Sequence, residues 1–302
     1  MTNRRKRFRE LLAHPQILVL PGTHDVLGAK LAQAAGFEAL VSGGYSASAT
    51  LLGEPDTSQL SYTEMVDHYA RLCDATDLPV LADADTGFGG VANVVRTVRG
   101  YERAGVAALL LEDQVYPKKC GHFAGKAVVS RAEWLGKLAA ALDARTDQSL
   151  VLVARTDSVA THGIDEAIER ACLAREAGAD MVFADALETH EHLRRFCAET
   201  GEARCLANVI EGGKSPELSA NELQELGFAA ALYALAPTYA VAYVLRELYG
   251  QLKRDGNTRA MRDRLVGFSE FNEIVGLGRF LAREERAARM ADETISNREA
   301  KK

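Results

Sequence analysis

The sequence predicts a (β/α)₈ barrel. Short apolar segments of strand length alternate with amphipathic helical segments eight times over roughly 240 residues, which is the length and rhythm of this fold. Three of the helical segments end in Ala-Gly just before the next apolar run, at Gly36, Gly105 and Gly178, where glycine is preferred after a helix. Eight strands can close into a ring without free edges, which favours the barrel over an open doubly wound sheet.

The expected strands are the apolar runs, because strands buried on both faces read as continuous hydrophobic segments. In chain order they cover residues 17–20, 39–41, 79–82, 107–111, 150–153, 180–183, 205–207 and 229–233. Apolar residues at helical spacing follow each run and predict helices at residues 26–35, 62–75, 91–104, 131–145, 164–177, 188–200, 219–226 and 238–255. We therefore assign residues 1–255 to the barrel and the charged, helical residues 256–302 to a C-terminal extension.

The bulk composition argues against nucleic acid and membranes as partners. The formal net charge is −6 with both signs mixed along the sequence, whereas phosphate binding requires concentrated positive charge. The basic cluster Arg4–Arg7 is expected to be a solvated helix start, since Phe8, Leu11 and Leu12 follow at helical spacing. No apolar run approaches the roughly 18 residues of a membrane span, and no signal-peptide core is visible. Five cysteines without a CxxC pair favour reduced thiols and a cytoplasmic location.

Polar residues follow the expected strands at their carboxyl ends, where the loops of a barrel carry its active site. They include Ser42-Gly43-Gly44, Asp83, Asp85, Glu112-Asp113, Arg155-Thr156-Asp157, Asp185 and Asn208. A helix cap explains one such residue at each strand, but not paired carboxylates at two adjacent strands. Asp83, Asp85 and Glu112 form a set of hard oxygen ligands without imidazole, which predicts a Mg²⁺ or Mn²⁺ site. The alternative is that they cap helices or pair with lysines such as Lys118.

Anion-binding groups accompany these carboxylates. Arg155 follows the expected strand at residues 150–153, and its planar guanidinium suits bidentate binding of a carboxylate. An internal ion pair with one of the aspartates is the alternative role for this arginine. Ser42, Gly43 and Gly44 offer a hydroxyl and unhindered N–H groups for an anion. A metal beside anion-binding groups predicts a small anionic substrate, a 2-hydroxy or 2-oxo acid.

The segment Lys118–His122 carries Cys120, the one cysteine in a loop rich in charge and glycine. Together with Asp83–Gly89 it resembles the isocitrate lyase / phosphoenolpyruvate mutase superfamily, for which these two motifs are highly specific. Shorter matching segments occur in order over about residues 10 to 280, at Ser42–Gly44, Leu52–Asp56, Glu112–Gln114, Ala154–Asp157 and Asn208–Pro216. The resemblance implies a modified barrel and a C-terminal helix exchanged between the subunits of a homotetramer. It also implies Mg²⁺ held by Asp83, Asp85 and Glu112, with Asp56 acting through water.

The resemblance further implies catalytic roles. In the carbon–carbon lyases of the superfamily the cysteine of this loop is the general acid, so we expect Cys120 to protonate the leaving carbanion. Lys118 and His122 are expected to tune the thiol and neutralise the departing carboxylate. The predicted catalytic residues are Cys120, His122, Arg155 and Lys118, and the predicted substrate-binding residues are Ser42, Gly43, Gly44, Tyr45, Cys120, Gly121, Arg155, Asp185, Asn208 and Glu211. The general base is not assigned, since Leu40 stands where many relatives have a tyrosine; Tyr45 is a candidate substitute.

Three positions bear on the substrate. Methylisocitrate lyases tend to have Glu at Asp185 and arginines at Tyr239 and near Phe268, so a third substrate carboxylate lacks its usual partners here. The resemblance therefore favours a Mg²⁺-dependent lyase that cleaves 2,3-dimethylmalate or another 2-alkylmalate, ahead of 2-methylisocitrate, to a 2-oxo acid and a carboxylate. The alternatives are a carboxyphosphonoenolpyruvate phosphonomutase-like enzyme, an oxaloacetate hydrolase or decarboxylase, and a non-catalytic binding protein.

Overall fold

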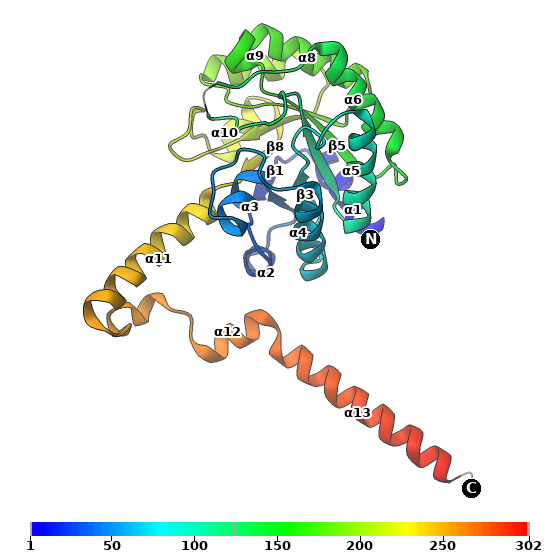
Figure 1. Cartoon of the computed structure of the whole chain (residues 1–302), viewed down its shortest axis with the longest axis vertical. Coiled ribbons are helices and arrows are strands. Elements are labelled where there is room, and N and C mark those ends of the chain that lie inside the picture. Colours follow the sequence, from blue (N-terminus) through cyan, green and yellow to red (C-terminus); the bar gives the residue numbers. More distant parts are fainter. Residues whose placement is uncertain (1, 124, 301–302) are drawn as a thin grey trace. The chain divides into compact units, whose positions relative to one another are not determined.

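The computed structural model describes residues 2–123 and 125–300. Residues up to Val241 form one compact unit, and residues from Ala242 onward form a second. The first unit contains an eight-stranded parallel sheet with the order β1-β8-β7-β6-β5-β4-β3-β2, surrounded by helices (Figure 1). An isolated parallel bridge joins Gly22, just after β1, to Val41 of β2, so the two ends of this order meet. The sheet is a nearly closed ring, and the predicted (β/α)₈ barrel is confirmed.

The strands lie where the apolar runs predict them. They are β1 (Leu18–Pro21), β2 (Leu40–Ser42), β3 (Val80–Asp83), β4 (Ala108–Glu112), β5 (Val151–Thr156), β6 (Met181–Ala184), β7 (Cys205–Asn208) and β8 (Phe228–Tyr233). The predicted helices correspond to α2 (Val26–Ala34), α4 (Tyr62–Ala75), α5 (Val91–Ala104), α6 (Arg131–Ala144), α8 (Ile164–Glu176), α9 (His190–Glu199), α10 (Ala220–Glu225) and α11 (Ala236–Asp255). Gly105 ends α5 in the left-handed conformation, with φ 95°, as expected for a glycine after a helix.

Two helices occur where the sequence predicts loops. Helix α3 (Gly44–Leu51) begins directly after β2, and α7 (Val159–His162) follows β5. Both are short, and the Gly-Gly pair at the start of α3 reads as a turn when the sequence is considered alone. Helix α3 matters for function, because its N-terminus lies at the carboxyl end of the barrel.

The N-terminal basic cluster begins a helix, α1 (Thr2–Ala13), as predicted, and Lys6 and Arg7 are exposed, but the prediction that the cluster is solvated is wrong for Arg5. Arg5 is only 6% exposed, and its Nε donates to the carbonyl of Val106 at 3.0 Å. Arg9 similarly donates to the carbonyl of Ser149 at 3.0 Å. These carbonyls precede strands and lack a partner in the sheet, so guanidinium groups satisfy them. Helix α1 thus covers the amino ends of the strands, with Phe8 packed on the barrel interior.

Side-chain alternation along the strands divides the core into two layers. Leu81, Leu110, Val153, Phe183 and Leu206 point into the barrel interior. Leu109, Leu152 and Val182 point outward and pack against the surrounding helices. The residues two positions after the inward set are Asp83, Glu112, Arg155, Asp185 and Asn208. The same alternation therefore brings these polar side chains together above an apolar floor.

The second unit is helical. After the part of α11 that it includes, it contains a short 3₁₀ segment (Arg259–Arg264), α12 (Phe268–Val275) and α13 (Leu277–Glu299). Its helices expose large apolar side chains, of which Phe268 is the most exposed at 87%. Within the described residues, none of the helices has both the length and the apolar character of a membrane span.

Candidate active site

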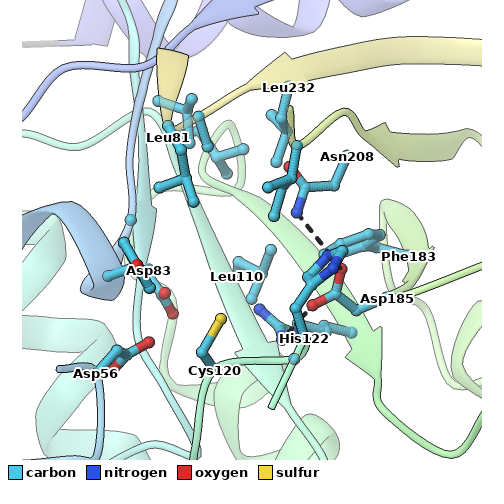
Figure 2. Close-up of a pocket in the computed structure, with 18 of the residues that line it drawn as sticks. Asp56, Leu81, Asp83, Leu110, Cys120, His122, Phe183, Asp185, Asn208 and Leu232 are labelled. Carbon is cyan, nitrogen blue, oxygen red and sulfur yellow. Dashed lines mark hydrogen bonds and ion pairs between the residues drawn. The ribbon is translucent and has the colours of Figure 1, made fainter. Parts of the chain in front are cut away.

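A cavity of about 590 Å³, counted with its open mouth, lies at the carboxyl ends of the strands (Figure 2). Its floor is apolar, with Val41, Leu81, Leu110, Phe183 and Leu232, and its polar walls come from strand ends and loops. The predicted site residues that line it are Gly43, Tyr45, Asp56, Asp83, Cys120, Gly121, His122, Arg155, Asp185 and Asn208. Segments that are far apart in the sequence therefore converge on one cavity, as the strand-end pattern predicts.

On one side of the cavity lie four acidic residues that we call the carboxylate cluster: Asp56, Asp83, Asp85 and Glu112. The ammonium of Lys118 lies 2.7 Å from Asp56 Oδ2 and 3.0 Å from Asp85 Oδ1. Asp83 accepts hydrogen bonds from the backbone N–H groups of Gly44 and Asp85, both at 3.0 Å. Gly44 is the first residue of α3, so a helix N-terminus stabilises the Asp83 carboxylate.

Glu112 is the most isolated member of the carboxylate cluster. It is fully buried, and neither of its oxygens accepts a hydrogen bond from the described residues. Arg155 Nε approaches one of these oxygens at 3.2 Å. Burial raises the pKa of Glu112 well above its ordinary value, against the opposing effect of Arg155 and Lys118. Burial also raises the pKa of Asp85 to about 7. Both acids therefore favour their protonated form unless a cation joins the cluster.

The donor set of the carboxylate cluster fits a hard divalent cation. It supplies only oxygen, and the carboxylate of Glu112 lacks the hydrogen-bond donors that a buried carboxylate otherwise requires. Across residues 2–123 and 125–300, no three His, Cys, Asp or Glu side chains are grouped closely enough to hold a metal ion together. The predicted set of three direct ligands, Asp83, Asp85 and Glu112, is therefore not gathered around one point. Mg²⁺ usually binds one or two carboxylates directly and keeps several waters, so the cluster can still hold the ion, and the magnesium site stays a prediction.

On the other side of the cavity, Arg155 organises a second group of acids. Its Nε donates to Asp157 Oδ2 at 2.8 Å, and its Nη2 donates to Asp185 Oδ2 at 2.7 Å. His122 Nε2 lies 3.7 Å from Asp185 Oδ1. Although burial opposes its charge, Arg155 and His122 hold the pKa of Asp185 well below its ordinary value. Arg155 therefore makes internal ion pairs, which were the alternative to binding a substrate carboxylate, and it also lines the cavity.

Cys120 lies between these two groups. Figure 2 shows its sulfur between the carboxylates of Asp56 and Asp83 on one side and the pair His122 and Asp185 on the other. The side chain is 8% exposed, and burial raises the pKa of the thiol to about 11. At neutral pH this thiol is protonated, so it can donate a proton into the cavity.

The loop that carries Cys120 is fixed to the barrel by side chains on both sides of the cysteine. Gln114 bonds both the N–H and the carbonyl of Lys119, at 3.0 and 2.8 Å. The Cys120 N–H donates to the carbonyl of Asp56 at 3.2 Å. Lys126 donates to the carbonyl of Gly121 and to Asp157 Oδ1, the latter at 3.0 Å. These contacts hold the thiol at a defined position in the cavity.

Gly121 has no room for a side chain, which leads to a first prediction. A Cβ at this position would lie 1.7 Å from Asp185 Oδ2 and 2.6 Å from Arg155 Nη2. Gly121→Ala must therefore shift the loop and move Cys120, and kcat/KM should fall about 100-fold or more in steady-state assays. Gly136→Ala is the control, since a Cβ there has no neighbouring atom within 4 Å. Wild-type kinetics for Gly121→Ala would show that the loop adopts another position during turnover.

Six of the predicted residues do not line the cavity: Ser42, Gly44, Asp85, Glu112, Lys118 and Glu211. The hydroxyl of Ser42 points outward and bonds His68 Nε2 at 3.0 Å, because Val41 takes the inward position on this strand. The N–H of Gly44 donates to the carboxylate of Asp83, and Lys118 pairs with Asp56 inside the carboxylate cluster. Glu211 does not contribute to the cavity wall. The catalytic, metal-binding and substrate-binding roles predicted for these six residues stay predictions.

The sequence reasoning missed several residues that hold the site together. Lys126 and Asp157 connect the cysteine loop to Arg155, and Gln114 fixes the start of this loop. Tyr69 and Tyr101 contact the backbone of Asp83 from the helix layer. Asp157 and Gln114 each lie two positions after a predicted site residue in the sequence, so the sequence could have indicated that they belong to the site. Lys126 and the two tyrosines carry no local signal, because their partners are distant in the sequence.

Known proteins with similar sequences support the same superfamily. A family model described as phosphoenolpyruvate phosphomutase matches residues 8–253. The 2,3-dimethylmalate lyase of Eubacterium barkeri is 45% identical over 275 residues, which cover 91% of this chain and 95% of the relative. A 2-methylisocitrate lyase of Halalkalibacterium halodurans is 40% identical over 283 residues, which cover 94% of this chain and 93% of the relative.

Solved structures with the same fold cover almost the whole chain. A structure of oxaloacetate acetylhydrolase in complex with the inhibitor 3,3-difluorooxalacetate has a TM-score of 0.90 at 33% identity, covering 95% of this chain and 98% of that chain. A phosphonopyruvate hydrolase in complex with oxalate and Mg²⁺ has a TM-score of 0.85 at 29% identity, covering 94% of this chain and 98% of that chain. The superfamily predicted from the motifs is thereby confirmed: the chain belongs to the phosphoenolpyruvate phosphomutase family, within the phosphoenolpyruvate mutase / isocitrate lyase superfamily.

Proposed function

We propose that this protein is a Mg²⁺-dependent lyase that cleaves a 2-alkylmalate, of the 2,3-dimethylmalate kind, to a 2-oxo acid and a second carboxylate. The observation that carries the proposal is the buried thiol of Cys120, which lines the same cavity as Asp56 and Asp83 of the carboxylate cluster. The predicted class, a carbon–carbon lyase, agrees with the lyases to which the chain is 45% and 40% identical. The substrate, the metal and the acid are the new parts of the proposal.

The two sides of the cavity suit the two halves of this reaction. When bound at the carboxylate cluster, Mg²⁺ would lower the pKa of the substrate hydroxyl and orient the adjacent carboxylate. A general base, for which Tyr45 in the cavity wall is the candidate, takes the hydroxyl proton. C–O then becomes C=O, the C2–C3 bond breaks, and its electron pair stays on the departing carbon. Cys120 donates its proton to that carbon and becomes a thiolate. His122 and Arg155 also line the cavity, where they stabilise the negative charge that develops during the reaction.

Magnesium binding is supported by the oxygen-only donor set and by a structural neighbour, a phosphonopyruvate hydrolase whose crystals contain Mg²⁺. Asp83 and Glu112 would hold the ion directly or through water, with Asp56 and Asp85 adding negative charge. Lys118 already pairs with two members of the cluster, so its ammonium and the metal would share the same acids.

The lining of the cavity supports a dicarboxylate over a tricarboxylate. Arg155 is the one guanidinium among the described lining residues, and three acidic neighbours already share it. Tyr239 stands where methylisocitrate lyases tend to have an arginine; burial and the neighbouring Tyr45 raise its pKa to about 12, so it stays neutral. Leu81, Leu110 and Leu232 offer apolar surface to an alkyl substituent. The homotetramer and the cytoplasmic location stay predictions.

The proposal is tested by measuring the release of 2-oxo acid from a panel of substrates, with Mg²⁺ and with EDTA. The panel contains 2,3-dimethylmalate, other 2-alkylmalates, 2-methylisocitrate, isocitrate and oxaloacetate. We expect the highest kcat/KM with a 2-alkylmalate and no turnover in EDTA. Full turnover in EDTA would exclude the metal, and a preference for 2-methylisocitrate would exclude the dicarboxylate assignment.

Oxaloacetate hydrolysis is a second candidate, supported by the TM-score of 0.90 with an oxaloacetate acetylhydrolase. That reaction also breaks a carbon–carbon bond, but water supplies the oxygen and the products are oxalate and acetate. Detection of oxalate from oxaloacetate in the same panel separates the two activities. A phosphonomutase-like activity is separated by offering phosphonopyruvate and following phosphorus by NMR.

A further inference from the structure

Two buried tyrosines on the surrounding helices make hydrogen bonds to the backbone of Asp83. Asp83 N–H donates to the hydroxyl of Tyr69 at 2.8 Å, and this hydroxyl donates to the carbonyl of Ser42 at 2.8 Å. The hydroxyl of Tyr101 donates to the carbonyl of Asp83 at 3.0 Å. Both tyrosines are 0% exposed, and they come from neighbouring helices, α4 and α5.

The hydroxyl of Tyr69 lies where the ladder between β2 and β3 ends. Ser42 pairs with Ala82 in this parallel ladder, so the next donor along β3 is Asp83 and its acceptor on β2 is Ser42. The Tyr69 oxygen is within hydrogen-bond distance of both groups and thus bridges the two strand ends. Asp83 and Gly44 lie on these two ends, and the Gly44 N–H holds the Asp83 carboxylate. The hydroxyl oxygen of Tyr69 therefore sets the distance between the backbone of Asp83 and the Gly44 N–H that binds its carboxylate.

We propose that Tyr69 is a positioning residue for the metal, with Tyr101 in a supporting role: its hydroxyl fixes the main chain of Asp83 so that the carboxylate is preorganised to bind a divalent cation. This inference rests on the proposed function, in which Asp83 is a metal ligand. Neither tyrosine lines the cavity, so neither contacts substrate. Loss of a residue that hydrogen-bonds to a metal ligand typically lowers metal affinity by about 10–100-fold.

The test measures the dissociation constant of Mn²⁺ directly, by the EPR signal of the free ion, in the full-length protein. Tyr69→Phe removes only the bridging oxygen, and we expect the dissociation constant to rise about tenfold, equivalent to about 1.4 kcal/mol. Tyr101→Phe removes a single hydrogen bond and should raise it about threefold. At saturating Mg²⁺, kcat should stay within about twofold of wild type, since the chemical groups are unchanged.

Tyr62→Phe is the matched control, because Tyr62 is on the same helix as Tyr69 and, among the described residues, its hydroxyl bonds only the carbonyl of Arg96, at 3.4 Å. Unchanged Mn²⁺ affinity in both Tyr69→Phe and Tyr101→Phe would overturn the inference, even if thermal stability falls. If Tyr69→Phe fails to fold, Tyr101→Phe alone decides. Asp83→Asn separates this result from the proposed function: if it binds Mn²⁺ like wild type, the metal assignment itself is wrong.

Discussion

Replacing Cys120 with serine should lower kcat about 10²–10⁴-fold, the range that general acid catalysis contributes. A serine hydroxyl fits the same space but is a far weaker acid than a thiol, so it protonates the departing carbon poorly. The loop contacts of residue 120 are made by its backbone N–H and carbonyl, which the substitution keeps. Binding of a non-cleavable 2-oxo dicarboxylate, measured by calorimetry, should therefore change by less than about threefold.

The pH profile gives an independent check on the acid. Because burial raises the pKa of Cys120 to about 11, the thiol stays in its acid form from neutral pH to about 10. The alkaline limb of kcat that belongs to this thiol should therefore lie near pH 11 and vanish in Cys120→Ser. Cys172→Ser is the control, since Cys172 is on α8 and bonds the carbonyl of Glu199 outside the cavity. Wild-type kcat in Cys120→Ser would remove the cysteine from the reaction.

The barrel and the strand-end residues were predictable because both depend on local patterns. Each apolar run is a buried strand, and side chains two residues apart share a face. Asp83 follows Leu81 at this spacing, and Glu112 follows Leu110, so their inward direction is encoded in the strand itself. The same alternation shows that Ser42, next to the inward Val41, must point outward. The outward direction of Ser42 can thus be inferred from the sequence, and it argues against an anion-binding role for the Ser42 hydroxyl.

The rest of the site depends on contacts between segments that are distant in the sequence. Tyr69 reaches Asp83 across 14 positions, and Lys126 reaches Asp157 across 31. Nothing in a tyrosine on a helical face distinguishes a side chain that packs in the core from one whose hydroxyl bridges two strand ends. Arg5 illustrates the same limit, because its partner carbonyl at Val106 exists only after the strands have assembled. Such residues are found only from the structure.

Arg155 shows that a residue can make internal ion pairs and still line the cavity, so these pairs are compatible with its proposed role in substrate binding. The bonds of Arg155 to Asp157 and Asp185 fix the plane of its guanidinium before any substrate enters. A charge held in place in this way stabilises developing negative charge without reorganising at the moment of reaction. The acids that surround Arg155 thus serve to orient it, and Lys126 connects the same acids to the loop that carries Cys120.

Glu112→Gln should have opposite effects on stability with and without Mg²⁺. Burial raises the pKa of Glu112 above its unfolded value, so the charged carboxylate destabilises the fold increasingly as pH rises from the unfolded pKa through the folded one. At pH 7–8 in EDTA, removing the charge should raise the free energy of unfolding, measured by urea denaturation. In excess Mg²⁺ the wild type gains the binding energy of the ion, whereas the variant does not, so the order reverses.

The same substitution should also remove a pH dependence of metal binding. Because Glu112 must lose its proton when the cation binds, Mg²⁺ affinity should rise with pH in the wild type, with proton release detectable by calorimetry in buffers of different ionisation enthalpy. Glu112→Gln should abolish this component and weaken Mg²⁺ binding by at least the roughly 10–100-fold that loss of an outer-shell partner costs. Glu54→Gln, at an exposed position, is the matched control. Equal Mg²⁺ affinity in Glu112→Gln and wild type would place the ion elsewhere, since no other buried carboxylate of the cluster has both oxygens without a hydrogen-bond donor among the described residues.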